Sequence, residues 1–219
     1  MAVNKDRVVI AAISMMRRRA DISVAQFRKH WLDPHGVLTA GLPGVRHYIQ
    51  SHVVESPYNN ALARELDLMG FPELWFESYD DRKIAYTSPR IAECNIDSEQ
   101  FIGAVKRIVA EPTIVKAAPK GGVKTFILNI DESTDPAWAD AYQERALKLP
   151  GVTGYVRQVI LEQAKAPNSK IPELVLPIAG IAEVSFENEQ ALAHHVGALV
   201  TADEVGRLAS YVVEDHVLV

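Results

Sequence analysis

The chain of 219 residues contains a single cysteine, Cys94. One cysteine cannot form an intrachain disulfide, and this sparse usage is typical of proteins in a reducing compartment. We therefore expect a cytoplasmic protein in which Cys94 acts as a half-buried small hydrophobic residue.

Long apolar runs and long basic runs are also missing. The main apolar stretch, Val8–Met16, is too short to span a bilayer, and Arg17–Arg19 follow it without a small-residue cleavage site. The formal net charge is −5, and three adjacent arginines do not make the broad basic face that nucleic-acid binding needs. We predict no membrane partner, no nucleic-acid partner and no signal peptide.

Several well-known sequence motifs are absent. The chain has no G-x-G-x-x-G or G-x4-G-K-[ST] phosphate loop and no G-x-S-x-G nucleophile turn. Its histidines lack the i, i+4 spacing that metal sites on helices prefer, since His30 and His35 are five residues apart. These absences favour chemistry without a nucleotide and without a metal ion.

What the chain does contain is an internal repeat. Leu42-Pro43-Gly44-Val45 recurs 107 positions later as Leu149-Pro150-Gly151-Val152, and each copy opens a strand-like run. Two further pairs follow in the same order: Glu73–Glu77 with Glu183–Glu187, at an offset of 110, and Ile108–Glu111 with Val212–Asp215, at an offset of 104. The repeat predicts two copies of one structural unit, residues 1–118 and 123–219.

Both copies show the same order of expected elements. β-branched and apolar runs predict four strands in each copy: Val8–Met16, Arg46–Glu55, Glu73–Tyr79 and Arg107–Ala117 in the first, and Lys124–Ile130, Val152–Glu162, Ala182–Phe186 and Tyr211–Val219 in the second.

The expected helices lie between these strands. Ser23 and Gln26 form a capping-box pattern, and Pro34 should end or kink the helix that they begin at about Leu32. Further helices are expected over 80–88, as a turn or helix over 97–105, from Asp135-Pro136 to Lys148, and over 189–199.

The order β-α-β-β-α-β is that of a ferredoxin-like unit, whose helices cover only one face of the sheet. The other face must be buried, and the second copy can bury it. We therefore predict an α+β protein of two tandem ferredoxin-like units packed sheet to sheet as an intrachain α/β barrel with a lumen.

The strand Arg46–Glu55 carries the first candidate site residues. Its period of two places Tyr48, Gln50 and His52 on one face. The opposite face is smaller and more apolar, so we assign it to the helices and assign the polar row to the lumen. There it could orient and protonate a small polar ligand. The alternative is a polar face of an edge strand in contact with solvent.

The kinked helix adds His30, Trp31 and His35. Trp31 is expected mainly to pack in a core, and His30 could lie on the surface. His35 follows the proline, where the chain can direct it toward the sheet. It is our leading candidate for an acid/base group, with a structural hydrogen-bonding role as the alternative.

These residues resemble a known family, the EthD-type domain of the dimeric α/β-barrel superfamily. The resemblance rests on Arg19, on Phe27, Trp31 and His35 at intervals of four, on Leu42-Pro43-Gly44, and on Tyr48-x-Gln50-x-His52. It is good over Val8–Glu55, weaker over the rest of the first half, and in the second half limited to the LPGV element and the strand order.

The resemblance implies units that pair through their sheets and a site between the first helix and the lumen. Relatives in the superfamily include lactone isomerases, polyketide cyclases, cofactor-independent monooxygenases and haem-binding enzymes, and many EthD-like proteins belong to catabolic settings. By motif position it implies that Trp31, His35, Tyr48 and His52 are site residues and that Arg19 contacts an anion.

The second copy lacks most of this set. Its counterparts of Gln50 and His52 are Arg157 and Val159, and no histidine follows Trp138 and Tyr142. We infer that the first copy carries the site and that the second copy mainly supplies a wall.

Three functions remain open. The first is a cofactor-independent isomerase, lyase or cyclase acting on a small oxygenated or aromatic molecule in catabolism. In it, His35 or His52 transfers a proton, Tyr48 and Gln50 hold an oxygen, Trp31 contacts the substrate, and Arg19 or Arg157 pairs a carboxylate. The others are a non-catalytic binding or stress-response protein and a haem-binding or monooxygenase-type enzyme. A homodimer is possible in each case.

Overall fold

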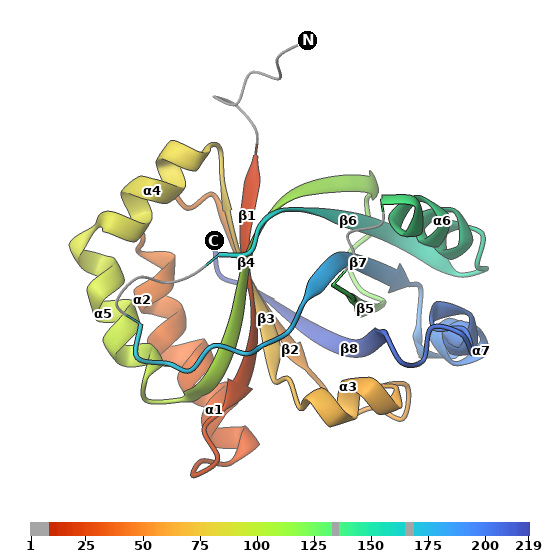
Figure 1. Cartoon of the computed structure of the whole chain (residues 1–219), viewed down its shortest axis with the longest axis horizontal. Helices are drawn as coiled ribbons and strands as arrows, with labels where there is room; N and C mark the ends of the chain where they lie inside the picture. Colours follow the sequence, from red (N-terminus) through yellow and green to blue (C-terminus); the bar gives the residue numbers. More distant parts are fainter. Residues whose placement is uncertain (1–8, 133–135, 165–168) are drawn as a thin grey trace.

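The computed structural model describes residues 9–132, 136–164 and 169–219, whose strands close into an eight-stranded antiparallel barrel (Figure 1). The strands are β1 (Ile10–Arg18), β2 (His47–Val53), β3 (Gly70–Phe76), β4 (Ile102–Lys116), β5 (Val123–Ile130), β6 (Val152–Glu162), β7 (Ile178–Phe186) and β8 (Leu208–Val217).

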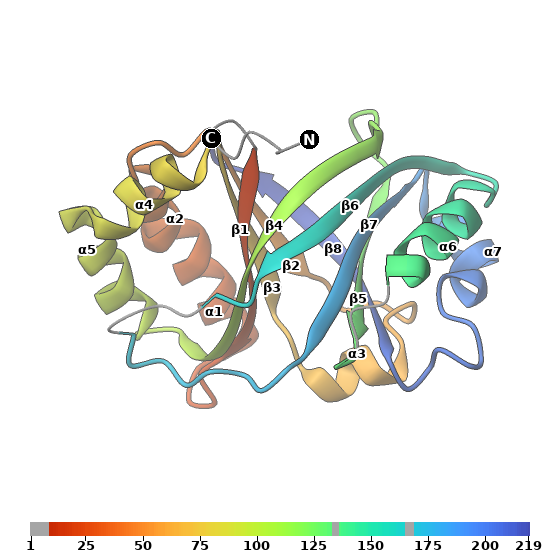
Figure 2. The same cartoon turned by 45° about the horizontal axis from the view of Figure 1, so that its top comes forward.

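The helical elements are α1 (Val24–His30), the π-helical segment η2 (Trp31–His35), α2 (Gly36–Ala40), α3 (Ala61–Leu66), α4 (Tyr79–Thr87), α5 (Pro89–Ser98), α6 (Pro136–Leu147) and α7 (Glu189–Leu199). Figures 1 and 2 show α1, α2, α4 and α5 on one side of the barrel and α6 and α7 on the other. Apart from the short helix α3, each half thus places its helices on one face of its own sheet, which confirms the predicted pair of ferredoxin-like units.

The two sheets join at their edges. The strand order is β4-β1-β3-β2 in the first half and β6-β7-β5-β8 in the second, and the barrel closes through β2 with β8 and β4 with β6. Closure satisfies the backbone groups that an open sheet would leave unpaired at its edges. The division of the chain into 1–118 and 123–219 stays a prediction, and it falls between the last strand of one sheet and the first of the other.

Local sequence explains where the site-bearing helix starts and breaks. Ser23 accepts a hydrogen bond from the backbone of Gln26 while the Gln26 side chain accepts one from the backbone of Ser23, so the predicted capping box is present. The helical path breaks at Asp33, whose backbone is extended before a cis peptide bond to Pro34. The chain then resumes as a helix, which turns His35 inward to a buried position.

Some predicted boundaries were wrong. The turn or helix expected over 97–105 lies earlier, as α5, because Pro89 begins a helix after Ser88 and β4 already starts at Ile102. The strand expected from Glu73 begins at Gly70. The predicted strand start at Val8 and the cap at Asp135 lie outside the described residues.

The repeat is visible in packing as well as in order. The ring of Trp31 lies against Gly70 of β3, and the ring of Trp138 in α6 lies against Gly180 of β7. A Cβ atom at Gly70 would be 2.3 Å from the Trp31 ring, and one at Gly180 would be 2.5 Å from the Trp138 ring. Each half therefore has a tryptophan in the helical segment after its first strand. The ring of this tryptophan leaves no room for a side chain on the strand beneath it, so the strand carries a glycine there.

The barrel interior is mainly an apolar core. Phe71 of β3 stacks on Phe126 of β5 with ring centroids 4.3 Å apart, and Tyr211 of β8 meets Phe71 edge-on. Ala63 in α3 and Leu68 just after it join the same cluster, so the 56–70 insertion packs against this core. The lumen is thus filled by side chains, as in other small barrels.

The barrel interior also contains a buried ionic cluster. The ammonium of Lys124 lies 2.8 Å from a carboxylate oxygen of Asp215, 3.0 Å from Glu183 and 3.9 Å from Glu73. Gln158 donates a hydrogen bond to Glu183, and Glu73 is 1% exposed with one oxygen lacking a hydrogen-bond partner among the described residues. One cation therefore faces three carboxyl groups in a poorly solvated space.

The faces of β2 are reversed from our sequence-based assignment. Tyr48 packs with Ala85 of α4 and Cys94 of α5 in the helix layer, whereas Ser51 bonds Asp215 and Val53 packs on the interior core. The more apolar face does meet the larger apolar core, but that core is the barrel interior. The helix layer of the first half, in contrast, supplies the Trp31 carbonyl as an acceptor for Gln50, and the Trp31 ring stacks on His52.

In the part of the chain that the structure describes, no helix has both the length and the apolar character needed to traverse a bilayer.

The contact between Trp31 and Gly70 predicts a specific loss of stability. In Gly70→Ala the new Cβ would also be 2.8 Å from the Ser51 carbonyl oxygen, so strand or tryptophan must shift. We expect a decrease of about 1–3 kcal/mol in the free energy of unfolding, measured by urea denaturation. The control is Gly197→Ala in α7, where a Cβ meets no atom within 4 Å and should stabilise the helix by about 0.5–1 kcal/mol. Equal effects of the two substitutions would contradict the packing argument.

The ionic cluster predicts a pH-dependent stability. Burial, reinforced by Glu183, raises the pKa of Glu73 to about 8. Between the ordinary pKa of 4.5 and this value, the folded state holds a proton that the unfolded chain releases. The free energy of unfolding therefore falls as pH rises across this window, by at most about 1.4 kcal/mol per pH unit.

In Glu73→Gln this contribution is absent, so the stability difference between variant and wild type should grow in favour of the variant from pH 5 to pH 8. Exposed Glu65→Gln serves as the control and should show a constant difference. A constant difference for Glu73→Gln as well would show that Glu73 ionises normally in the folded protein.

Candidate functional site

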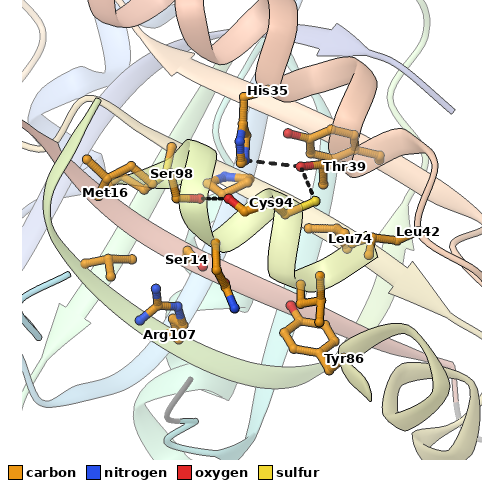
Figure 3. Close-up of a pocket in the computed structure, with 16 residues that line it drawn as sticks. Ser14, Met16, His35, Thr39, Leu42, Leu74, Tyr86, Cys94, Ser98 and Arg107 are labelled. Carbon is orange, nitrogen blue, oxygen red and sulfur yellow. Dashed lines mark hydrogen bonds between the residues drawn. The ribbon is translucent and has the colours of Figure 1, made fainter. Parts of the chain in front are cut away.

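A cavity of about 100 Å³ lies between the sheet of the first half and its helices (Figure 3). β1, β2, β3 and β4 form its floor, and η2, α2, α4 and α5 form its walls. Its lining residues are Ser14, Met16, His35, Thr39, Leu42, Tyr48, Pro72, Leu74, Tyr86, Ile91, Cys94, Asn95, Ser98, Ile102, Val105 and Arg107. The cavity is thus on the helix side of the sheet and not in the barrel lumen.

His35 is held at this cavity by Asp97, which lies near the end of α5. The Nδ1 atom of His35 is 2.8 Å from Oδ2 of Asp97, and Nε2 of His30 is 2.9 Å from Oδ1 of the same carboxylate. Burial by itself would raise the pKa of Asp97, but the hydrogen bonds of His35 and His30 bring it below its ordinary value. The carboxylate is therefore ionised and fixes the orientation of both imidazoles.

Thr39 completes a chain of polar contacts. Its Oγ1 atom lies 3.1 Å from Nε2 of His35, one helical turn earlier, and 3.9 Å from the Cys94 sulfur. When Nδ1 of His35 donates to Asp97, Nε2 of the neutral ring is an acceptor and the Thr39 hydroxyl donates to it. Burial raises the pKa of the Cys94 thiol, so this group is a protonated neighbour and not a nucleophilic thiolate.

Tyr48 links the cavity to a second buried network. Its hydroxyl accepts a hydrogen bond from Nε2 of Gln50 at 2.7 Å, and the same nitrogen donates to the Trp31 carbonyl at 2.7 Å. The amide oxygen of Gln50 lies 2.9 Å from Nε2 of His52, whose ring stacks on Trp31 at 4.0 Å. Burial raises the pKa of Tyr48, so the phenol keeps its proton at neutral pH and can donate it into the cavity.

His52 belongs to this network and does not line the cavity. Burial, with smaller contributions from His216 and Arg28, lowers the pKa of His52 to about 3. The ring is therefore neutral over the physiological range, and its geometry is that of a group that holds Gln50 in place.

Arg107 is the cation at the cavity. It comes from β4, is half-buried, and lies across the pocket from His35 in Figure 3. Its guanidinium donates a hydrogen bond to the Ser169 hydroxyl at 3.3 Å. Burial lowers the pKa of Arg107, against the opposing effects of Tyr86 and Glu173.

The structure brings together some of the predicted site residues and separates others. His35 and Tyr48 line the cavity, and Trp31, Gln50 and His52 lie directly behind Tyr48. Arg19 instead pairs with Asp21 and the Glu99 carbonyl at the surface, and Arg157 pairs with Asp140 on the second half. Neither arginine reaches the cavity.

The sequence reasoning missed Asp97, Thr39 and Arg107. Thr39 could have been found, because it is four residues after His35 and one helical turn away. Asp97 is 62 residues from His35, and nothing local to either residue signals the contact.

The equivalent space in the second half is filled. Trp138 and Tyr142 of α6 pack with Tyr155 of β6 between helices and sheet, all three at most 8% exposed. By the repeat offset of 107, Trp138 and Tyr155 match Trp31 and Tyr48, whereas Tyr142 stands in place of His35, so the second half lacks this imidazole.

Among the described residues, no cluster of three or more histidine, cysteine, aspartate or glutamate side chains has the geometry to hold a metal ion.

Comparison with known proteins agrees with this architecture. The sequence model of the EthD domain matches residues 19–104, which lie in the first half of the chain. The matched region ends at the start of β4 and includes His35, Tyr48 and Asp97. None of the curated protein sequences compared with the chain matches it.

Solved structures share the fold over nearly the whole length. An anthrone oxidase-like protein is similar with a TM-score of 0.59 at 11% identity, covering 98% of this chain and 94% of its own. A mutant chlorite dismutase from Candidatus Nitrospira defluvii, in complex with cyanide, is similar with a TM-score of 0.51 at 9% identity, covering 95% and 91%. At such low identity these likenesses establish the fold alone.

The described residues do not fit haem in the first-half cavity. Asp97 holds Nδ1 of His35, so Nε2, which hydrogen-bonds Thr39, is the nitrogen of this ring that faces the cavity. His52 lies under Trp31 with its Nε2 on Gln50. The cavity of about 100 Å³ is also well below the roughly 300–1,000 Å³ of pockets for larger ligands.

Proposed function

We propose that the protein is an acid/base enzyme of the isomerase, lyase or cyclase type that needs no cofactor. Its substrate is a small oxygenated or aromatic organic molecule, bound in the first-half cavity. The observation that carries the proposal is His35 held between Asp97 and Thr39 at the cavity wall.

In this proposal His35 is the general base. Its Nε2 accepts a proton from a carbon next to a substrate carbonyl as the Thr39 hydroxyl turns from His35 toward the Cys94 sulfur. The charge that develops on the imidazole is stabilised by the Asp97 carboxylate, 2.8 Å from Nδ1. The protonated ring then returns the proton to a different substrate atom, which completes an isomerisation with all atoms retained.

Tyr48 supplies the complementary acid. Its phenol is protonated, and Gln50 fixes its oxygen through the donated amide hydrogen. The O–H of Tyr48, which lies beside Thr39, can donate to the substrate carbonyl oxygen and stabilise the enolate that forms when His35 removes the proton. His52 then has a positioning role through Gln50, because it lies outside the cavity and stays neutral.

A non-catalytic binding protein is the alternative that uses the same cavity. It needs the cavity and its polar groups but makes no use of the aligned Asp97, His35 and Thr39. A role in catabolism, a cytoplasmic location and a homodimer remain predictions alongside either function.

Proton exchange distinguishes the two functions without knowledge of the natural substrate. Small lactones, enones and aromatic acids with exchangeable α-protons are incubated in D2O with the protein, and deuterium uptake is followed by NMR. We expect catalysed uptake for at least one compound. His35→Gln should reduce the rate by about 10²–10⁴, and Asp97→Asn should reduce it in the same direction.

The matched control is His194→Gln, since His194 is an exposed histidine of α7 in the second half. His194→Gln should catalyse deuterium uptake at the wild-type rate. Binding of these compounds without any catalysed exchange would favour the binding protein, and exchange that survives His35→Gln would exclude His35 as the base.

A further inference from the structure

The side chain of Arg107 faces the cavity without a counterion. In the described part of the chain no carboxylate lies within ion-pair distance of its guanidinium, which contacts only the Ser169 hydroxyl through one nitrogen. Glu173, the carboxylate that affects its pKa, pairs instead with Lys106 at 3.9 Å. A half-buried cation at a cavity with spare N–H donors is a receptor for an anion, because an unpaired buried charge is unfavourable.

The rest of the lining restricts the size and charge of that anion. Arg107 is the only arginine or lysine among the described cavity residues, so one negative charge is matched and two are not. Apolar side chains form much of the remaining wall: Met16, Leu42, Leu74, Ile91 and Val105. A cavity of about 150 Å³ accommodates benzene in another protein, so about 100 Å³ suits a short acid smaller than a benzene ring.

The shape of the guanidinium favours a carboxylate. Its planar fork can bind both oxygens of a carboxylate at once, which a spherical halide or a single alkoxide cannot reproduce. In Figure 3, His35 and Thr39 lie on the side of the pocket opposite Arg107. A molecule bound by Arg107 at one end would therefore place its other end next to the acid/base groups.

We propose that the cavity binds a small monocarboxylate with a short apolar or unsaturated body, and that Arg107 pairs with its carboxylate. The position of the reacting carbon beside His35 rests on the proposed function, whereas anion binding by Arg107 does not. Arg107 thus takes the role that the sequence had suggested for Arg19 or Arg157.

The test compares acids with neutral amides of the same shape. Crotonate and butyrate, with crotonamide and butyramide as partners, are titrated into the full chain by calorimetry. We expect the wild type to bind at least one acid at least tenfold more tightly than its amide. Arg107→Met should remove that preference by weakening acid binding tenfold or more while leaving amide binding unchanged, and Arg107→Lys should retain part of it.

Arg46→Met is the control, because Arg46 is an exposed arginine that pairs with Glu77 and does not line the cavity. It should bind acids as the wild type does. Circular dichroism checks that Arg107→Met is folded, and Arg107→Lys provides the comparison if it is not. Equal affinity for acid and amide in the wild type, absence of acid binding at millimolar concentration, or an unchanged preference in Arg107→Met would each overturn the proposal.

The acid-binding test and the proton-exchange test can fail independently of each other. Acid binding through Arg107, with no proton exchange that depends on His35, would leave this inference standing and reject the enzyme. Exchange of neutral carbonyl compounds that depends on His35, with no preference for acids, would support the enzyme and reject this inference.

Discussion

The ionised carboxylate of Asp97 is the constraint on which the site depends. It accepts hydrogen bonds from His30 and His35, one on each oxygen, and so joins the end of α5 to the kinked segment around Pro34. This contact fixes which nitrogen of His35 is available to the cavity. Without it, the imidazole would be one buried polar group among several, with no defined direction for proton transfer.

The two ferredoxin-like units of the barrel differ in their helix layers, and this difference makes the site possible. Edge pairing of β2 with β8 and of β4 with β6 buries the inner faces of both sheets together. The helix layers are then free to diverge. The second layer is packed tightly by Trp138, Tyr142 and Tyr155, while the first keeps a cavity lined by polar groups. Both layers share the contact of a tryptophan from the helix layer with a strand glycine, as expected for two copies of one structural unit.

Much of the fold could be predicted from the sequence because its signals are local or repeated. Each LPGV turn contains a glycine with a positive φ angle, Gly44 in the first copy and Gly151 in the second. The Ser23 capping box is likewise a short-range feature. The period of two along β2 correctly grouped Tyr48, Gln50 and His52. It could not say which layer this face would meet, because that depends on whether the helix layer or the barrel interior holds the larger apolar core.

The site was predicted only in part for a related reason. His35 and Tyr48 belong to a contiguous motif, whereas Asp97 and Arg107 reach the cavity from α5 and β4 through tertiary contacts. Arginines that are prominent in sequence, such as Arg19, find partners nearby at the surface. Arg107, the arginine that lines the cavity, forms no ion pair with a described carboxylate.

The central claim is that Asp97 holds His35 with a proton on Nδ1, leaving Nε2 as an acceptor at the cavity. Nitrogen-15 NMR of the histidine side chains reports this tautomer directly. The account predicts that neutral His35 is the Nδ1–H form in the wild type and loses this strict preference in Asp97→Asn. A neutral His35 that carries its proton on Nε2 in the wild type would contradict it.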